Sequence, residues 1–370
     1  MRLNAIQLFA NSAITISTLL IPIVAQQLGA SGTQIGIIVA AYNCALFIST
    51  YIFSRASDSY PPKILLYAGF ISATVTFFLQ IFAKEPLSLG VIRVLAGFSV
   101  GIFPAVLLLY VYNLKRSIGN FSSFMALGWA FGYLAVYAIS KYPDISITGN
   151  VYLELFAVSS LFFAVVVLIT LKLPDIRVTV KKRVDYFSSD ILKKNGSIYF
   201  GFFLRQVGAN SVWAIFPLYL LSLGADLSDV ALVYMLNPAL QFFIMRRLDR
   251  YSPAYLIHAG DLLSAVAFAA LIPLEIYYQA AAGMVLIAFS YSCLYVGSTR
   301  QLIETNEEKG AAAGLLNSSI ALASIIGSLM GGIILEVYGF KAVMETAVIF
   351  SILGYGVFHF NTSGKPQKNS

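Results

Sequence analysis

Twelve apolar runs of about 20 residues each divide this sequence, and they restrict the chain to a small set of folds. A helix needs about 20 apolar residues to cross the bilayer core, whereas a spanning strand needs about 10 alternating ones. These runs are continuous, so they predict an all-α polytopic membrane protein. The expected spans are 5–28, 33–53, 62–83, 86–112, 118–141, 150–173, 196–222, 228–246, 253–274, 276–299, 310–335 and 341–360.

The composition supports the same class. Hydrophobic residues make up 59% of the 370 residues and charged residues only 11%, against about 25% charged in soluble domains. This excludes a soluble globular protein and a disordered chain. Cys44, Cys293 and two histidines form neither a disulfide framework nor a metal-binding cluster. No nucleophile constellation stands out either, so we expect no cofactor, no metal and no enzymatic activity.

Basic residues are strongly biased to one side of the predicted membrane. Nineteen of the 24 Lys and Arg fall in loops and termini on one side, three on the other, and two inside the spans. The biased side of a multi-span protein is cytoplasmic, so both termini are expected inside, in the cytoplasmic membrane. The net charge of +7 then needs no nucleic-acid partner. The first run is interpreted as a retained span and not as a signal peptide.

The two halves of the chain repeat each other. Residues 53–69 and 244–260 match at seven of seventeen positions at an offset of 191. The first helices align at an offset of 195, which pairs Leu28-Gly29-Ala30 with Leu223-Gly224-Ala225. The difference is about one helical turn and must fall in the second or eighth span; the eighth is the shorter. We therefore expect two six-helix bundles in parallel repeat, with a binding site between them near the midplane.

The repeat sets the expected domain boundaries. An N-terminal bundle covers 1–173, a basic cytoplasmic linker covers 174–195, a C-terminal bundle covers 196–361 and a tail covers 362–370. The later part of the linker places Val184, Phe187 and Ile191 on one helical face, which is typical of an interfacial helix. A solvated tether with basic anchors is an equally good interpretation.

Twelve spans arranged as six plus six around a basic loop resemble the major facilitator superfamily. The loop between spans 2 and 3 keeps Asp58 and Lys63 of the family's signature, and the second copy keeps Asp249 and Arg250, although both copies lack its glycines. A second family signature at span 4 is matched by Arg93, with Gly97 and Gly101 after it. The resemblance implies alternating access and a cavity lined by spans 1, 4, 7 and 10. It also implies a gating role for Asp58, Asp249 and Arg250, for which solvated loop charges are the alternative.

Two arginines lie inside the spans. A charge there is costly, by at least ~2.5 kcal/mol, and usually faces the bundle interior. Arg205 lies about nine residues, or ~14 Å, into span 7, and we expect it to contact substrate or take part in coupling. Arginine is permanently charged and planar, which suits a carboxylate or phosphate. Because the family pattern includes Arg93, a structural or coupling role is favoured for it. Asp261 in span 9 is interpreted as a structural partner for a base, with proton coupling as the alternative.

Polar residues at helical spacing mark candidate cavity walls. Span 1 carries one stripe, and residues beside Arg205 and a tyrosine pair in span 10 add others. Helix–helix hydrogen bonding is the alternative for the stripes, and interfacial anchoring for the tyrosines. The candidate cavity residues are Gln7, Asn11, Thr15, Arg205, Gln206, Asn210, Tyr291 and Tyr295.

These observations favour a secondary active transporter of a small organic solute, with an anionic group as the finer expectation. In the family that this chain resembles, a Gly-Pro pair in span 5 is the signature of antiporters. The pair is absent here, which disfavours a drug–proton antiporter, but export of amphipathic compounds stays an alternative. A non-transporting membrane sensor or assembly protein on the same scaffold is the alternative of another class. We expect a monomer in the lipid bilayer, with a proton or another ion as a candidate coupling partner.

Overall fold

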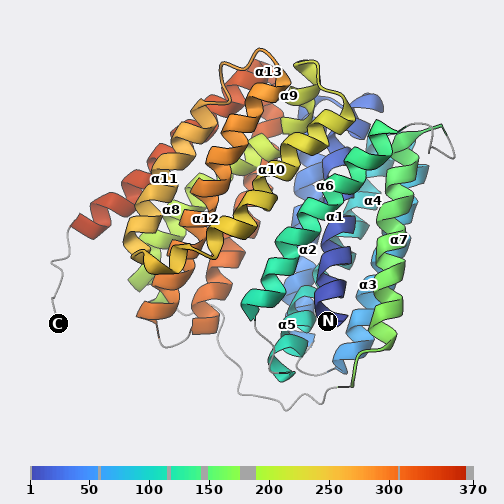
Figure 1. Ribbon diagram of the computed structural model, residues 1–370, viewed down its shortest axis with the longest axis horizontal. Coiled ribbons are helices and arrows are strands. Elements are labelled where there is room, and N and C mark those ends of the chain that lie inside the picture. The colour runs from blue at the N-terminus through green and yellow to red at the C-terminus, as the bar shows by residue number, and fades with distance from the viewer. Residues whose placement is uncertain are drawn as a thin grey trace.

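The computed structural model describes residues 2–56, 60–114, 118–142, 149–175, 189–306 and 309–363. The described residues form helices joined by short loops, as predicted, and form no strand (Figure 1). The helices are α1 (Arg2–Gln27), α2 (Gly32–Ala56), α3 (Pro62–Leu79), η1 (Gln80–Phe82), α4 (Pro86–Ile102), α5 (Pro104–Asn113), α6 (Ile118–Lys141), α7 (Val151–Leu171), α8 (Ser189–Trp213), α9 (Phe216–Ser222), α10 (Leu227–Met245), η3 (Leu248–Arg250), α11 (Pro253–Ala269), η4 (Tyr277–Gln279), α12 (Ala280–Thr305) and α13 (Lys309–Ser363).

These helices make up the twelve expected spans, but five of the spans differ in detail. The fourth span is broken into α4 and α5 before Pro104, and the seventh into α8 and α9 before Pro217. Proline has no N–H to donate, so a helix tends to end ahead of it. The eleventh and twelfth spans run together in α13, where Gly339 makes the bend at a φ of 80°. The ninth span is shorter than expected, because α11 ends at Ala269.

The start of the seventh span also differs from the expectation. Helix α8 begins at Ser189, so the last residues of the predicted linker are helical, with a kink at Asn195. Ile191 therefore belongs to α8, where it is buried. The remainder of the predicted interfacial segment, including Val184 and Phe187, lies outside the described residues.

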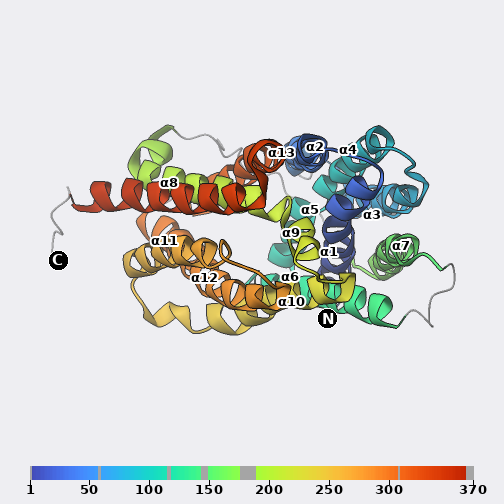
Figure 2. The same cartoon turned by 90° about the horizontal axis from the view of Figure 1, so that it is seen from above.

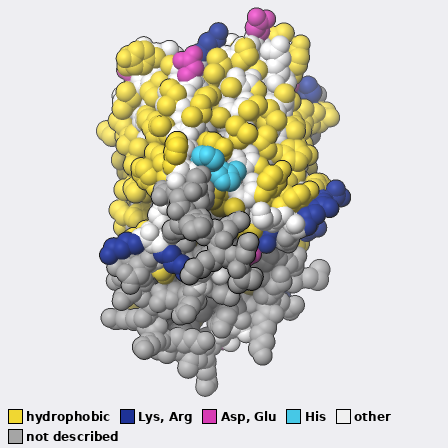
Figure 3. All heavy atoms as spheres, turned by 90° about the vertical axis from the view of Figure 1, so that its left-hand side faces the viewer, with side chains coloured by type: hydrophobic (Ala, Val, Ile, Leu, Met, Phe, Trp, Pro, Cys, Tyr) yellow, Lys and Arg dark blue, Asp and Glu magenta, His cyan; other side chains and the backbone are white. Residues whose placement is uncertain are grey.

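The surface matches a bilayer. Nine helical stretches of the described residues are long and apolar enough to cross a membrane, and one of them, Leu315–Phe360, contains two spans. A band of apolar side chains covers the face in Figure 3, with Lys and Arg at its lower edge. We call this edge the basic end of the molecule; the other is the opposite end. The described residues that define the basic end are Arg2, Lys63, Lys172, Arg246 and Arg300.

Two six-helix halves lie side by side, α1–α7 at the right of Figure 1 and α8–α13 at the left. They meet mainly where α2 packs on α13 and α6 packs on α10. These are spans 2 with 11 and 5 with 8, so a rotation that exchanges the halves also exchanges the two contacts. The shorter eighth span is confirmed, because α10 has 19 residues and α2 has 25.

The first span of each half ends in the same motif. Ala30 N–H donates to Ala25 at 2.9 Å and Gly29 N–H to Gln26 at 3.0 Å; in the second half Ala225 donates to Leu220 at 3.1 Å and Gly224 to Leu221 at 3.0 Å. This is a Schellman motif, which needs a residue with positive φ after the helix. Gly29 and Gly224 have φ values of 87° and 88°. The offset of 195 found in the sequence therefore holds in three dimensions.

The apolar core shows how the halves are arranged along the membrane normal. One cluster joins both halves and includes Leu20, Ile23, Leu218 and Val230, all in helix segments toward the opposite end. Toward the basic end the clusters are separate: one is built only from α1–α7 and another only from α8–α13. The halves are thus packed together at the opposite end and divided at the basic end.

Candidate substrate cavity

A cavity of about 320 Å³ lies between the halves. This is within the range of about 300–1,000 Å³ that small organic ligands occupy in proteins. Helices α1 and α6 form one wall, and α8, α9, α10 and α12 form the other. The fourth span, which the resemblance led us to expect, does not contribute to the lining of this cavity. The lining residues are Ile14, Thr15, Thr18, Leu19, Trp129, Tyr133, Arg205, Gln206, Trp213, Pro217, Tyr234, Asn237, Pro238, Gln241, Ile287 and Tyr291.

Arg205 is the charged residue of this lining, and its side chain is 1% exposed. Its Nε donates to Ser264 Oγ at 2.9 Å, its Nη2 donates to Ser290 Oγ at 3.3 Å, and its Nη1 donates to Gln206 Oε1. All three acceptors are neutral. A guanidinium carries five N–H donors, so the described contacts leave two for another acceptor. Arg205 is therefore held rigidly by neutral groups, with its positive charge directed to the cavity wall.

Asp261 lies behind Arg205 on α11, 1% exposed. It is close enough to interact electrostatically with the guanidinium, but the two make no ion pair within 4 Å in the described structure. Its Oδ1 is buried without a hydrogen-bond partner. Ser264, one turn along α11, accepts the bond from Arg205 and donates to Ser290 at 3.2 Å or to the Gly260 carbonyl at 2.8 Å. Arg205, Ser264 and Ser290 thus form a small polar network, and Asp261 lies outside the cavity lining.

Aromatic rings from both walls also line the cavity. Tyr234 of α10 packs on Tyr133 of α6, with centroids 5.4 Å apart, and on Trp213 of α8 at 5.8 Å. The Tyr234 hydroxyl is buried and makes no hydrogen bond in the described structure. On the same face of α10, Gln241 Nε2 donates to Asn237 Oδ1 at 2.6 Å. The walls therefore combine flat apolar surfaces with a few directed polar groups.

The structure places four of the predicted cavity residues on the lining: Thr15, Arg205, Gln206 and Tyr291. The remaining predicted residues lie outside the lining of this cavity. Asn11 and Asn210 donate to backbone carbonyls of their own helices, both at 2.8 Å, and Tyr295 stacks on Tyr291 at 5.7 Å. Gln7, Asn11 and Tyr295 lie nearer the basic end along α1 and α12.

Sequence reasoning missed the contribution of α6 and α10. The signal was present in α10, where four lining residues follow helical spacings of three and four on one face. In α6 the signal was weaker, because two aromatic residues four positions apart look like any apolar stretch. The missed residues are Trp129, Tyr133, Tyr234, Asn237, Pro238 and Gln241.

Arg93 lies away from the cavity, inside the first half. Its Nη1 donates to Ser17 Oγ at 3.1 Å, and its guanidinium lies 3.7 Å from the centre of the Tyr42 ring. Ser17 in turn donates to Gln80 Oε1 at 2.6 Å. The side chain is 1% exposed. These contacts join α1, α2, η1 and α4, which suits the structural half of the structural or coupling role expected for this residue.

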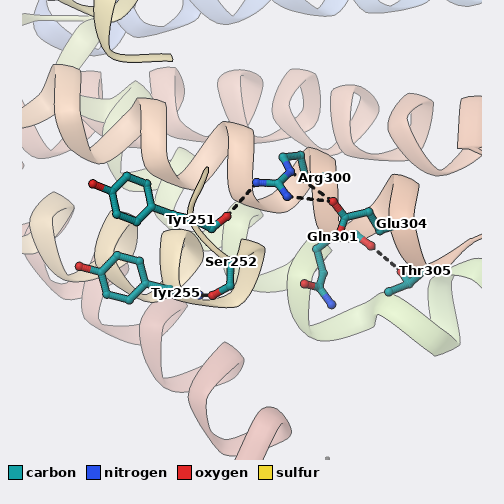
Figure 4. A network of polar contacts seen from close by, with 7 residues as sticks. All are labelled: Tyr251, Ser252, Tyr255, Arg300, Gln301, Glu304 and Thr305. Atoms are coloured by element: carbon teal, nitrogen blue, oxygen red, sulfur yellow. Dashed lines mark hydrogen bonds and ion pairs between the residues drawn. The ribbon is translucent and has the colours of Figure 1, made fainter. Parts of the chain in front are cut away.

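The predicted gating residues are only partly visible. Asp58 and the side chain of Asp249 lie outside the described part of the chain. Arg250 is exposed, and its Nε donates to the Arg247 carbonyl at 3.1 Å. The loop next to it is tied to α12 by Arg300, which donates to the Tyr251 carbonyl at 2.8 Å and pairs with Glu304 at 3.1 Å (Figure 4).

A contact that the sequence did not indicate closes the opposite end. The Glu336 carboxylate of α13 accepts a bond from Ser31 Oγ at 2.9 Å and from Thr33 N–H at 2.8 Å, at the start of α2. Below it the two helices touch through glycines: a Cβ atom on Gly36 would lie only 2.7 Å from the Ser328 carbonyl oxygen. This contact joins the two halves directly.

Two six-helix halves around a midplane cavity, packed together at one end and divided at the other, are the architecture of an alternating-access membrane transporter. The sequence agrees with this class. The chain belongs to the Major Facilitator Superfamily, which it matches over residues 3–237 and again over 198–370.

Relatives in this family cover nearly the whole chain. An uncharacterized MFS-type transporter of Methanocaldococcus jannaschii is 22% identical over 358 residues, which is 90% of this chain and 89% of that protein. The fold is similar to a bacterial homolog of the human lysosomal transporter Spinster in an inward-facing, occupied conformation, with a TM-score of 0.81 at 13% identity over 98% of this chain and 96% of that one. The nucleoside transporter NupG gives a TM-score of 0.78 at 13% identity, over 99% and 100%.

Proposed function

We propose that this transporter moves a small organic solute with an anionic group across the cytoplasmic membrane, and that Arg205 is the anchor for that group. The observation that carries the proposal is the buried guanidinium on the cavity wall, bound only to neutral acceptors and with donors to spare. A carboxylate or phosphate satisfies such a fork with two parallel bonds. The aromatic rings of Tyr133, Trp213 and Tyr234 would hold the solute's flat or apolar part.

Access would alternate by rocking of residues 1–173 against residues 196–361, with 174–195 as the tether. We place the basic end in the cytoplasm, because positive residues favour that side. On this assignment the halves are divided toward the cytoplasm, which makes the conformation inward-facing. Glu336 and the glycine contact of α2 with α13 would then close the external side. The protein is proposed to act as a monomer, since each chain contains a whole cavity.

We further propose that a proton on Asp261 is the coupling ion. An ionised Asp261 offsets the charge of Arg205, whereas a protonated one leaves that charge free for the solute anion. The charged group that interacts with this carboxyl is Arg205 on α8, which itself lies near Tyr291 on α12. His258 of α11 faces His359 and Tyr355 of α13 instead. Solute anion and proton would therefore bind together and cross in the same direction.

A ligand screen tests the anchor. Purified protein and an Arg205→Gln variant are heated with carboxylates, organic phosphates, neutral sugars, nucleosides and lipophilic cations. A ligand that binds only the folded state raises the unfolding temperature by mass action. We expect one anion class to stabilise the wild type, with that stabilisation lost in Arg205→Gln. An Arg93→Gln variant is the control, because it removes the other buried arginine.

Stabilisation by cations or neutral amphiphiles that survives Arg205→Gln would refute the anionic solute. That outcome would favour export of amphipathic compounds, for which the aromatic walls are equally suited. If no compound class stabilises the protein, the proposal is tested by uptake of radiolabelled anions into proteoliposomes. Uptake by the wild type that is lost in Arg205→Gln would support it. Absence of any uptake or efflux would favour a non-transporting role.

A further inference from the structure

A second cavity lies on the outer surface of the first half, away from the substrate cavity. It has a volume of about 770 Å³ and is formed by α1, α6 and α7 toward the basic end. Figure 2 shows α1 between α6 and α7, and these two outer helices make few contacts with each other. The result is a crevice whose floor is α1. The lining residues are Arg2, Asn4, Ala5, Leu8, Phe9, Phe124, Val165, Leu168, Ile169 and Lys172.

Apart from Asn4, the crevice is apolar from its mouth inward, and it is closed at its inner end. Phe9, Phe131 and Phe162 fill the space between the helices there, with ring centroids 5.5 to 6.5 Å apart. From Arg2 to Phe9 there are seven residues of helix, or about 10 Å. Leu168 on its rim is 61% exposed, so the crevice opens to the lipid-facing surface. An apolar slot of this length and place suits part of an acyl chain.

The mouth of the crevice carries two positive charges. Arg2 donates one bond to the Lys172 carbonyl, which holds the guanidinium at the mouth and leaves its other donors free. Both side chains are exposed, and the described lining contains no acidic residue. The nearby carboxylate of Asp175 is occupied by Lys63 at 3.3 Å. Charge at the mouth is therefore positive and not compensated by an acid of the lining.

We propose that this crevice binds one anionic phospholipid from the leaflet at the basic end. One acyl chain of the lipid would lie against α1, and the phosphate of its headgroup would lie between Arg2 and Lys172. Basic groups at the membrane surface attract anionic lipid headgroups, and pockets between spans on the cytoplasmic side bind them. The site is independent of Arg205 and of the proposed substrate. It requires only that the basic end faces a leaflet containing anionic lipid.

Native mass spectrometry of the detergent-purified protein tests the site. Dioleoylphosphatidylglycerol and dioleoylphosphatidylcholine are titrated separately, and the fraction of protein with one bound lipid is measured at each concentration. We expect a tight one-to-one adduct with dioleoylphosphatidylglycerol and none with dioleoylphosphatidylcholine. Each surface charge is worth about fivefold in affinity, so Arg2→Gln with Lys172→Gln should weaken it about 30-fold. The matched control, Arg246→Gln with Arg247→Gln, removes two charges from the same end of the other half and should change the affinity less than twofold.

A second pair of variants tests the acyl slot. Leu168→Gln makes the rim polar and should weaken the adduct about fivefold. Leu161→Gln, on the same helix and 59% exposed, lies outside the crevice and should have no effect. Equal binding of both lipids, or equal loss in the variants and their controls, would overturn the proposal. Displacement of the adduct by glycerol 3-phosphate alone would also overturn it, since the headgroup without the chain would then suffice.

Discussion

Arg93 and Arg205 show how the same side chain serves two purposes at two positions. Both are buried within the membrane-spanning region. Arg93 lies over the Tyr42 ring and bonds to Ser17, so its contacts stay within one half of the molecule. Arg205 lies on the wall between the halves, where a ligand can reach it. Hence we expect the first residue to be needed for stability and the second for binding.

Arg93→Gln should lower the stability of the protein without changing its ligand affinity. Loss of a hydrogen bond to a charged group costs about 1.5–3 kcal/mol, and the stacking on Tyr42 is lost as well. Thermal unfolding and ligand titration of the same preparation give both numbers. Arg205→Gln removes three hydrogen bonds and should lower the stability as well, but it should also abolish binding of the anion. Equal losses of affinity in the two variants would contradict this division of roles.

Asp261→Asn should remove the pH dependence of anion binding. In the wild type, falling pH protonates Asp261 and removes the negative charge that competes for Arg205, so affinity for the anion should rise. The asparagine variant resembles the protonated state and should bind tightly at every pH. Isothermal titration at several values from roughly pH 5 to pH 9 measures this. A variant that keeps the wild-type pH profile would place the coupling site elsewhere.

At the residue scale, the sequence predicted the cavity in part. A charge such as Arg205, or a polar stripe that includes Thr15, stands out in an apolar span because it is costly there. Trp213 and Tyr234 do not stand out, because aromatic residues are common in lipid-facing positions, in the core and at the membrane interface. Asn11 satisfied the spacing rule, yet its amide bonds to its own helix, which spacing alone does not exclude.

At the scale of helices, glycine decides where two spans come closest. Gly128 of α6 lies against Leu8 and Gly132 against Ser12, where added Cβ atoms would be 2.6 and 2.8 Å from the carbonyl oxygens. Two glycines four residues apart are typical of such close packing between membrane helices, but this spacing does not show which helices meet. Gly36 makes the corresponding contact between halves, because α2 and α13 approach there without side chains between them.

Gly36→Val should separate α2 from α13 and open the closed end. The added carbons would overlap the Ser328 carbonyl oxygen, so the packed arrangement becomes less stable than one with the halves apart. A cysteine at Thr15, in a protein with Cys44 and Cys293 replaced by serine, reports access to the cavity. Labelling by a membrane-impermeant maleimide from the external side of proteoliposomes should become several-fold faster.

The control for this variant is Gly196→Val. Gly196 is also in a helix, but no atom lies within 4 Å of an added Cβ. Its labelling rate should equal that of the parent protein. Faster labelling in both variants would mean that valine acts through helix stability and not through the contact of α2 with α13.

Breaks within spans could be predicted from proline only in part. Pro104 and Pro217 follow breaks in the fourth and seventh spans, whereas Pro22 and Pro238 lie inside continuous helices. A proline removes one hydrogen bond wherever it occurs. Whether the helix then breaks or continues depends on the packing around that turn, which sequence alone does not show.

For the whole molecule, the repeat in the sequence was enough to predict two equivalent halves, and the fold agrees. The sequence could not indicate which end would be closed. Both conformations use the same helices and differ by only a few kcal/mol, so the preference depends on small contacts such as that of Glu336 with Ser31.

Spin labels at Tyr60→Cys and Tyr251→Cys should follow the rocking of the halves. These repeat-related residues are exposed and lie at the basic end of each half. Double electron–electron resonance measures the distance between the two labels, in a protein with Cys44 and Cys293 replaced by serine. In the unliganded protein this distance should be long. A second, shorter distance should grow when Gly36→Val is introduced. An unchanged distribution would contradict rigid-body motion.

The single charge on the cavity wall has an electrical consequence. A transmembrane voltage would act on an uncompensated Arg205 charge with up to ~2.3 kcal/mol per 100 mV. Under the proposed coupling, an ionised Asp261 offsets that charge in the empty carrier, and a monovalent anion offsets it in the loaded carrier, where Asp261 is protonated. Neither crossing would then move net charge, so membrane potential would leave the rates of loading and resetting almost unchanged.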